Sequence, residues 1–177
     1  MNIEDVRRAV EGDSEAIGKI ILENTQSMYR VAFSILKNEE EIYDAISNTT
    51  VIVFEKISSL RKEEFFKTWL TRILINECYK IYNQNKKIVY LENLGQDNIR
   101  GYTDTYTDFE TRNIVKNLAQ DLRKTVILYY FEDFSVKEIA KVLEIPEGTV
   151  KSRLSRARKE LEFALIKNEP ERRDLNG

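Results

Sequence analysis

Residues that break regular structure are scarce in this chain. Its 177 residues include six glycines and two prolines, about 4.5 % of the total against roughly 12 % in average proteins. This scarcity favours long helices over a β-sandwich or a disordered chain. Apolar residues make up 42 % and charged residues 33 %, which is enough to form one or two modest cores beneath a charged surface.

Histidine is absent, and Cys78 is the single cysteine. The chain therefore excludes disulfides, metal sites built from histidine and cysteine, and catalysis by Ser-His-Asp or Cys-His groups. No GxGxxG or GxxxxGK loop is present to hold a phosphate. We expect no enzyme activity, no cofactor, no metal site and no small-molecule substrate, and we interpret Cys78 as a small apolar residue within a helix.

Long apolar runs are absent too. The longest covers residues 126–131, six residues, whereas a membrane span needs about 18. The N-terminus is polar and acidic, unlike a secretory signal, which begins with basic residues followed by an apolar stretch. The sequence therefore predicts a cytoplasmic protein.

Apolar residues at spacings of three and four predict four helices in the first part of the chain. The β-branched run at residues 49–54 is assigned to a helix because the longer helical period outweighs it. The expected helices run over residues 3–11 up to Gly12, from a cap at Asp13 or Ser14 to about Lys37, from about 42 to 57, and from the turn at 58–64 to about 82.

This periodicity lapses over residues 83–109, which are rich in Asn, Gly, Thr, Asp and Tyr. A loop of this length is uncommon inside one compact domain, so it predicts a flexible linker. The expected fold class is all-α, with two small helical domains. Their predicted ranges are 1–82 and 110–170, with a tail at 171–177.

The second domain carries the pattern of a helix-turn-helix. Apolar spacing predicts a helix through Ile114, Leu118, Leu122, Val126 and Tyr130. Ser135 and Glu138 then form a capping box at the start of a short helix over residues 136–143. A break follows in which Pro146 suits the first helical position. The last helix is predicted over residues 147–167, and its core side is expected to comprise Leu154, Ala157, Leu161 and Leu165.

This last helix concentrates positive charge although the whole chain has a net charge of −2. Residues 149–160 contain five basic residues and one acidic residue. A basic helix of this kind attracts DNA phosphates and fits the major groove, where Arg and Lys can contact guanine edges. The alternative interpretation is an ordinary solvated charged face. The capped helix and the turn before it favour DNA binding.

Residues 121–161 resemble the promoter −35-binding domain of the sigma-70 family of RNA polymerase sigma factors, and within it the small extracytoplasmic-function (ECF) group. The resemblance rests on Glu138-Ile-Ala, on Ile145-Pro and on Gly148-Thr-Val-Lys-Ser-Arg-Leu-Ser-Arg-Ala-Arg. The stretch Phe66-Lys-Thr-Trp-Leu-Thr-Arg-Ile-Leu-Ile-Asn76 resembles the family's −10-binding helix, FxxWLxRIxxN. The chain departs from the family where an acidic residue, a glutamine and a second acidic residue are usual, because only the first, Asp44, is kept.

The resemblance implies three groups of site residues. Asn76 matches the residue that captures a base flipped out of the −10 duplex, although a solvent-facing helical Asn is the alternative. Phe66 and Trp69 are expected in the core rather than stacked on bases. The implied −35 contacts are Thr149, Lys151, Ser152, Arg153, Ser155, Arg156 and Arg158. The implied −10 contacts are Asn76, Arg72, Lys80, Phe65 and Arg61, and the polymerase-binding positions are Asp44, Ser47 and Asn48.

The resemblance further implies a dissociable transcription initiation factor that binds RNA polymerase core and promoter DNA and helps to open the −10 DNA. It also implies an anti-sigma factor partner, of the membrane-anchored kind, that keeps the protein inactive. Two other functions remain open. One is a stand-alone DNA-binding regulator, which would bind promoter DNA without polymerase and as a dimer. The other is a helical interaction protein with no role in nucleic-acid binding.

Overall fold

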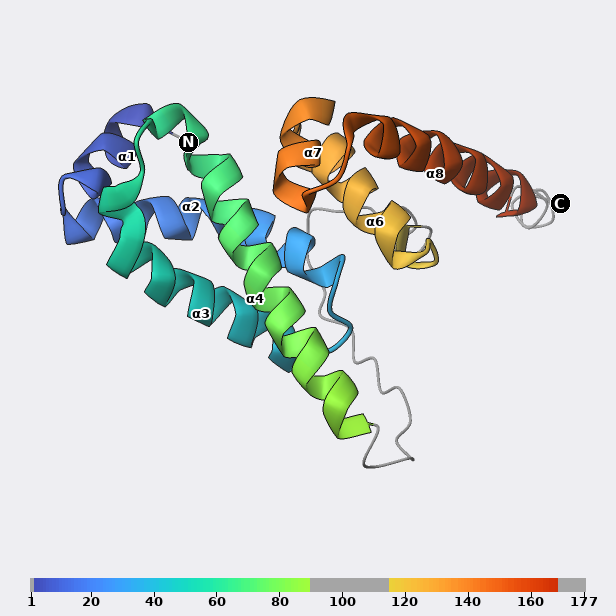
Figure 1. Cartoon of the computed structure of the whole chain (residues 1–177), viewed down its shortest axis with the longest axis horizontal. Coiled ribbons are helices and arrows are strands. Elements are labelled where there is room, and N and C mark those ends of the chain that lie inside the picture. The colour runs from blue at the N-terminus through green and yellow to red at the C-terminus, as the bar shows by residue number, and fades with distance from the viewer. Residues whose placement is uncertain (1, 90–114, 169–177) are drawn as a thin grey trace, which may run out of the picture. The chain divides into compact units, whose positions relative to one another are not determined.

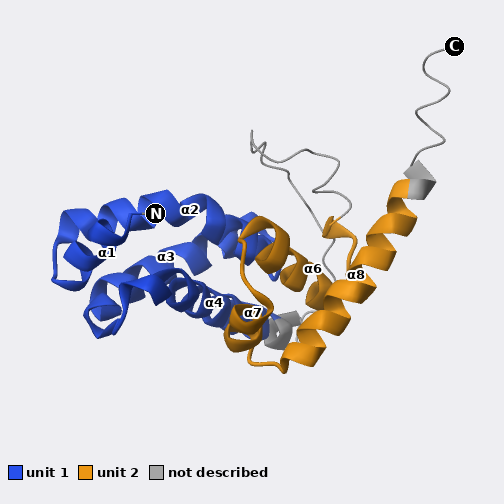
Figure 2. Ribbon diagram, turned by 90° about the horizontal axis from the view of Figure 1, so that it is seen from above, with its two compact units in different colours: residues 1–101 blue, residues 102–177 orange. Residues whose placement is uncertain are grey.

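The structure, a computed structural model, describes residues 2–89 and 115–168 (Figure 1). The chain divides into two compact units, residues 1–101 and 102–177, which Figure 2 colours separately. Every regular element in the described ranges is a helix or a helical turn. The expected all-α class is therefore confirmed.

The first unit begins with two capped helices, α1 (Ile3–Val10) and α2 (Ser14–Phe33). Gly12 separates them with φ of +98°, a conformation that glycine adopts without steric cost. The Oδ1 atom of Asp13 accepts hydrogen bonds from the backbone N–H groups of Glu15 and Ala16 in the first turn of α2, at 3.0 and 3.1 Å. The predicted stop and the predicted cap are both confirmed.

The end of α2 differs from the prediction. The helix ends at Phe33 rather than near Lys37, and the chain tightens into a turn. The N–H of Ile35 donates to the carbonyl of Ala32 at 2.9 Å, a three-residue spacing. This turn buries Ile35 and Leu36. Apolar spacing alone does not distinguish such a turn from a further helical turn, because both place these side chains in the core.

Helix α3 (Glu39–Lys56) packs against both α2 and α4 (Phe66–Val89) (Figure 1). Two short 3-10 turns, η1 (Ile57–Ser59) and η2 (Glu63–Phe65), connect α3 to α4. Full burial of a Leu, Ile or Phe side chain stabilises the fold by about 1.5–3 kcal/mol. Buried apolar side chains of this unit include Val6, Ile20, Val31, Ile42, Val53, Phe66, Leu70, Leu74 and Cys78.

The prediction ended α4 near residue 82, but the helix continues to Val89. Residues 83–89 contain neither Gly nor Pro, so nothing in the local sequence stops the helix there. Asn85 also donates from Nδ2 to Oε1 of Glu41 in α3, at 2.7 Å. This long-range bond ties the added turns to the rest of the unit. The remaining positions of the predicted linker, 90–109, lie outside the described residues.

The second unit contains α6 (Gln120–Val126), the π-helical turn η3 (Ile127–Phe131), α7 (Val136–Leu143) and α8 (Glu147–Asn168). The bounds of α7 match the predicted helix, and α8 begins at the predicted residue. Pro146 stands one position earlier than expected. It precedes α8, and its carbonyl accepts from the N–H groups of Thr149 and Val150 at 2.9 and 3.2 Å.

Two apolar residues on the predicted helical faces of this unit are exposed. The wider turn η3, in which the N–H of Glu132 bonds to the carbonyl of Ile127, rotates Tyr130 out to an exposed position. Leu165 is exposed as well. Helix α8 has 22 residues and is about 33 Å long, whereas α7 has eight and is about 12 Å long. The end of α8 therefore extends past α7. Ile114 lies outside the described residues.

The described helices include none that combines the length and the apolar character needed to cross a bilayer.

Glu144 ends α7 in the left-handed region, with φ of 54°. A side chain with a Cβ is strained there, and glycine is not. We expect Glu144→Gly to raise the free energy of unfolding by about 0.5–1 kcal/mol, measured by urea denaturation, because relief of the left-handed strain outweighs the added entropy of the unfolded chain. Lys141→Gly, placed within the same helix, should lower it by about 1 kcal/mol. Equal destabilisation by both variants would contradict the account.

Cys78 is fully buried in α4, and burial raises the pKa of its thiol to about 12. Since the thiolate is the reactive form, we expect a disulfide reagent to label the native chain very slowly at pH 8 and to label it rapidly in denaturant. Ser14→Cys, at an exposed position, supplies the control and should add one fast-reacting thiol. Fast labelling of Cys78 in the native chain would show that the helix opens or that the thiol is accessible.

Candidate nucleic-acid interface

Helices α7 and α8 form the predicted helix-turn-helix. The Ser135 Oγ accepts from the N–H of Glu138 at 3.2 Å, and the Glu138 carboxylate accepts from the N–H of Ser135 at 2.9 Å. This reciprocal capping box fixes the start of α7. The turn at Glu144 then redirects the chain, and the N–H of Ile145 bonds back to the carbonyl of Ala140 at 3.0 Å.

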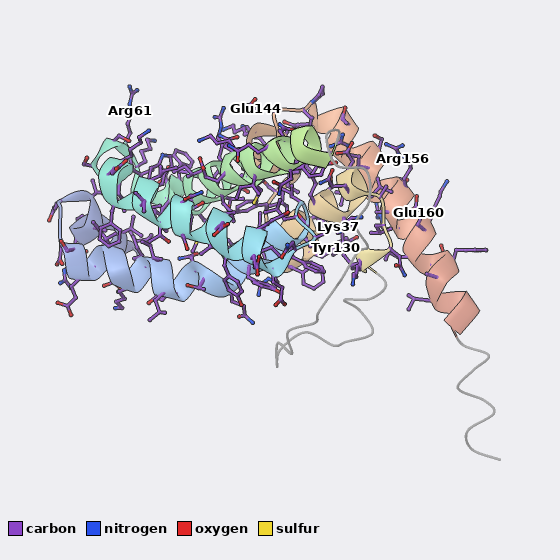
Figure 3. The ribbon with its side chains drawn as sticks, turned by 90° about the horizontal axis from the view of Figure 1, so that it is seen from below. Lys37, Arg61, Tyr130, Glu144, Arg156 and Glu160 are labelled. Atoms are coloured by element: carbon purple, nitrogen blue, oxygen red, sulfur yellow. The ribbon has the colours of Figure 1, made fainter. Side chains whose placement is uncertain are left out.

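The two sides of α8 differ in burial. Val150, Leu154 and Ala157 are buried, and their spacing of four and three residues places them on one face. The opposite face is exposed and carries both positive charge and hydroxyl groups. Its exposed members are Lys151, Ser152, Ser155, Arg156 and Lys159. Figure 3 labels Arg156 on this helix. We call these five residues the basic face.

Arg153 lies apart from the basic face. Its side chain is 14 % exposed, and its Nη2 pairs with Oδ2 of Asp121 in α6 at 2.9 Å. Asp121 also binds Lys124 Nζ through Oδ1 at 2.6 Å. The hydrogen bond from Lys124 is the main reason that the pKa of Asp121 lies below its ordinary value, and the charge of Arg153 contributes. The sequence alone did not indicate that Asp121 is the partner of Arg153, because the two residues are 32 positions apart.

The remaining −35 candidates, Thr149 and Arg158, have local partners. Thr149 lies half-buried in the first turn of α8, and its carbonyl accepts from the hydroxyl of Ser152 at 2.9 Å. Arg158 is exposed and donates from Nε to the carbonyl of Leu154 at 3.4 Å. Both therefore lie on the same helix as the basic face, at its start and along its flank.

The −10 candidates on α4 share one side of the helix. Arg72, Asn76 and Lys80 are exposed and follow at intervals of four residues. The Nζ of Lys80 pairs with Oε1 of Glu77 at 2.5 Å. The structure thus brings the amide of Asn76 between two basic side chains along one helical stripe.

The aromatic and loop candidates lie at the start of α4. Phe65 and Arg61 are exposed, and Arg61 is labelled in Figure 3. The ammonium of Lys62 lies 5.7 Å from the centre of the Phe65 ring. Phe66 is fully buried, and the Trp69 ring lies 6.2 Å from it at a tilted angle. The core assignment of Phe66 is therefore confirmed, while Trp69 is half-buried.

The polymerase candidates Asp44, Ser47 and Asn48 are exposed on α3. Large apolar side chains that the sequence interpretation left unassigned lie on the same helix. Val51 is 57 % exposed, and Tyr43 and Phe54 are also exposed. The signal was present in the sequence, because these residues are off the buried positions 42, 45, 49 and 53. Among the described residues, no group of acidic or cysteine side chains is arranged to hold a metal ion.

Comparison with known families matches both units. The family described as Sigma-70 region 2 matches residues 20–88, and the family described as Sigma-70, region 4 matches residues 109–161. These matches together cover well over half of the chain. They include the −10 candidates on α4 and the helix-turn-helix as far as residue 161.

Individual relatives align over most of their length. The RNA polymerase sigma factor SigV of Bacillus subtilis is 28 % identical over 150 residues, which cover 84 % of this chain and 90 % of SigV. The ECF RNA polymerase sigma factor SigW of the same organism is 26 % identical over 172 residues, which cover 88 % of this chain and 92 % of SigW.

A solved structure shares the fold. The sigma factor RpoE of Bartonella quintana, crystallised with the anti-sigma factor NepR, superposes with a TM-score of 0.74 and 24 % identity over 84 % of this chain and 96 % of RpoE. The two family matches, the named relatives and the helix-turn-helix with its basic face agree. The chain belongs to the sigma-70 family of RNA polymerase sigma factors, in its extracytoplasmic-function group.

Proposed function

We propose that this protein is a dissociable transcription initiation factor that binds RNA polymerase core and directs it to specific promoters. The observation that carries the proposal is the basic face of α8, which lies opposite the buried side of a capped helix-turn-helix within the matched region 4. Such a helix fits the major groove of DNA. Membership of the sigma-70 family supplies the connection to polymerase.

Each part of the chain has a distinct role in this proposal. Residues 110–170 bind the −35 element and residues 1–82 bind the −10 element and polymerase, with 83–109 as a linker and 171–177 as a tail. In α8, Lys151, Ser152, Ser155 and Arg156 contact the major groove. The Lys151 ammonium is a point charge, whereas the Arg156 guanidinium is a bidentate hydrogen-bond donor. Lys151 is therefore less selective among bases than Arg156. Thr149, Arg153 and Arg158 are assigned to phosphate contacts at the edge of this surface.

Asn76 is the base-reading residue of the −10 site. An amide carries both a donor and an acceptor, which pair with the Watson–Crick edge of a base that has left the stack. Arg72 and Lys80, on the same side of α4, attract the phosphates around that base. Phe65 stacks on an unpaired base, and Arg61 neutralises the charge of nearby DNA phosphates.

The charge of the chain agrees with a factor that needs a partner. A net charge of −2 makes the free protein a weak DNA ligand, so polymerase supplies much of the attraction to the phosphate backbone. The protein performs no catalysis of its own and works in the cytoplasm with polymerase. RpoE was crystallised with an anti-sigma factor, which supports a similar inhibitory partner for this chain.

Run-off transcription from a pool of genomic promoter fragments tests the proposal. We expect core polymerase to produce discrete new transcripts only when this chain is added. Asn76→Ala and Arg156→Ala should each reduce them by about fivefold to a hundredfold, because each removes a contact worth about 1–3 kcal/mol. Glu15→Gln, at an exposed residue of α2, serves as the control and should not change them. DNA binding by the chain without any new transcript would favour the stand-alone regulator.

Binding to core polymerase tests the docking residues on α3. The family usually carries an acidic residue where Asn48 stands, so Asn48→Glu should strengthen binding severalfold, whereas Asp44→Ala should weaken it by a similar factor. Both follow from charge pairs across an interface. Fluorescence anisotropy of the labelled chain with core polymerase measures both. If neither variant changed the affinity, this face of α3 would not be the docking surface.

A further inference from the structure

The carboxylate of Asp121 joins α6 to the DNA-binding helix. One oxygen accepts from Lys124 Nζ at 2.6 Å and the other from Arg153 Nη2 at 2.9 Å. Both oxygens are therefore engaged by cations, although the Asp121 side chain is 54 % exposed. Arg153 is held against α6 and is only 14 % exposed.

The negative charge of Asp121 also interacts with Arg156 of the basic face. Arg156 follows Arg153 by three residues, so the two side chains are neighbours on the surface of α8. The pKa of Asp121 is lowered first by its hydrogen bond with Lys124 and then by the charges of Lys124, Arg153 and Arg156, while burial opposes the shift. Asp121 is thus a negative charge placed beside a surface that must attract phosphates.

We propose that Asp121 lowers the affinity of α8 for DNA by offsetting the positive charge of Arg153 and Arg156. The inference rests on the proposed function, because it takes the basic face as the DNA-binding surface. Each basic residue that neutralises a phosphate releases counterions and strengthens binding. The Asp121 carboxylate forms an ion pair with Arg153 and attracts the charge of Arg156, so it reduces the counterion release that these two residues can provide. It also repels the phosphates directly. The free factor then binds DNA weakly and depends on polymerase to reach it.

Asp121→Asn tests the inference, because it removes the charge and keeps the size of the side chain. The matched control is Glu15→Gln, which changes the net charge equally. Glu15 is exposed on α2 of the first unit and lies outside the helix-turn-helix. Asp121→Glu restores the charge and should restore wild-type affinity.

The measurement is fluorescence anisotropy of the full chain with a labelled 30-base-pair duplex of mixed sequence, at several salt concentrations. We expect Asp121→Asn to bind about twofold to fivefold more tightly than wild type, which is the size of an exposed charge effect. The slope of log affinity against log salt should steepen by up to about one unit. Glu15→Gln should bind like wild type. Circular dichroism verifies that each variant is folded.

Two results would overturn the inference. If Asp121→Asn bound DNA equally well or more weakly than wild type while folded, Asp121 would instead hold Arg153 in a productive position or have no effect on DNA. If Arg156→Ala failed to weaken duplex binding, the basic face itself would not contact DNA, and the proposed function would fail together with the inference. A tighter Asp121→Asn with a weaker Arg156→Ala supports both.

Discussion

The division of α8 into a buried face and a charged face is the constraint on which the proposed DNA site depends. Val150, Leu154 and Ala157 are buried within the second unit. Because a helix advances by 3.6 residues per turn, anchoring these three positions fixes the direction of every other side chain on α8. Lys151, Ser155 and Arg156 are exposed as a result and do not depend on their own contacts for their direction. The packing of the core thus positions the DNA-binding groups.

Much of this fold was predictable because several of its local signals are strong. The capping box of Ser135 and Glu138 and the stop at Gly12 depend on residues within three or four positions of one another, so short-range chemistry determines them. The ends of α2 and α4 were less predictable. The first depends on a tight turn that buries Ile35 and Leu36, and the second includes a bond between Asn85 and Glu41. Contacts across the fold leave no periodic pattern in the sequence.

The candidate site shows the same contrast. The exposed positions of Asn76 and Arg156 follow from helical periodicity, which the sequence displays directly. The ion pair of Arg153 with Asp121 does not, because the partners are 32 residues apart. The exposure of Tyr130 was not evident from the sequence for a different reason, since a single π-helical turn changes the period for the residues within it. Sequence patterns therefore identified the helices and their faces, while the partners of individual charged side chains required the structure.

Footprinting of the reconstituted polymerase on a promoter tests most directly whether α8 binds the −35 element. With the wild-type chain, the account predicts protection of both the −35 and the −10 regions. With Arg156→Ala, the −35 protection should be lost or strongly reduced while polymerase still carries the factor, because only the upstream contact is removed. Undiminished −35 protection with Arg156→Ala and Lys151→Ala combined would contradict the assignment of the basic face to DNA.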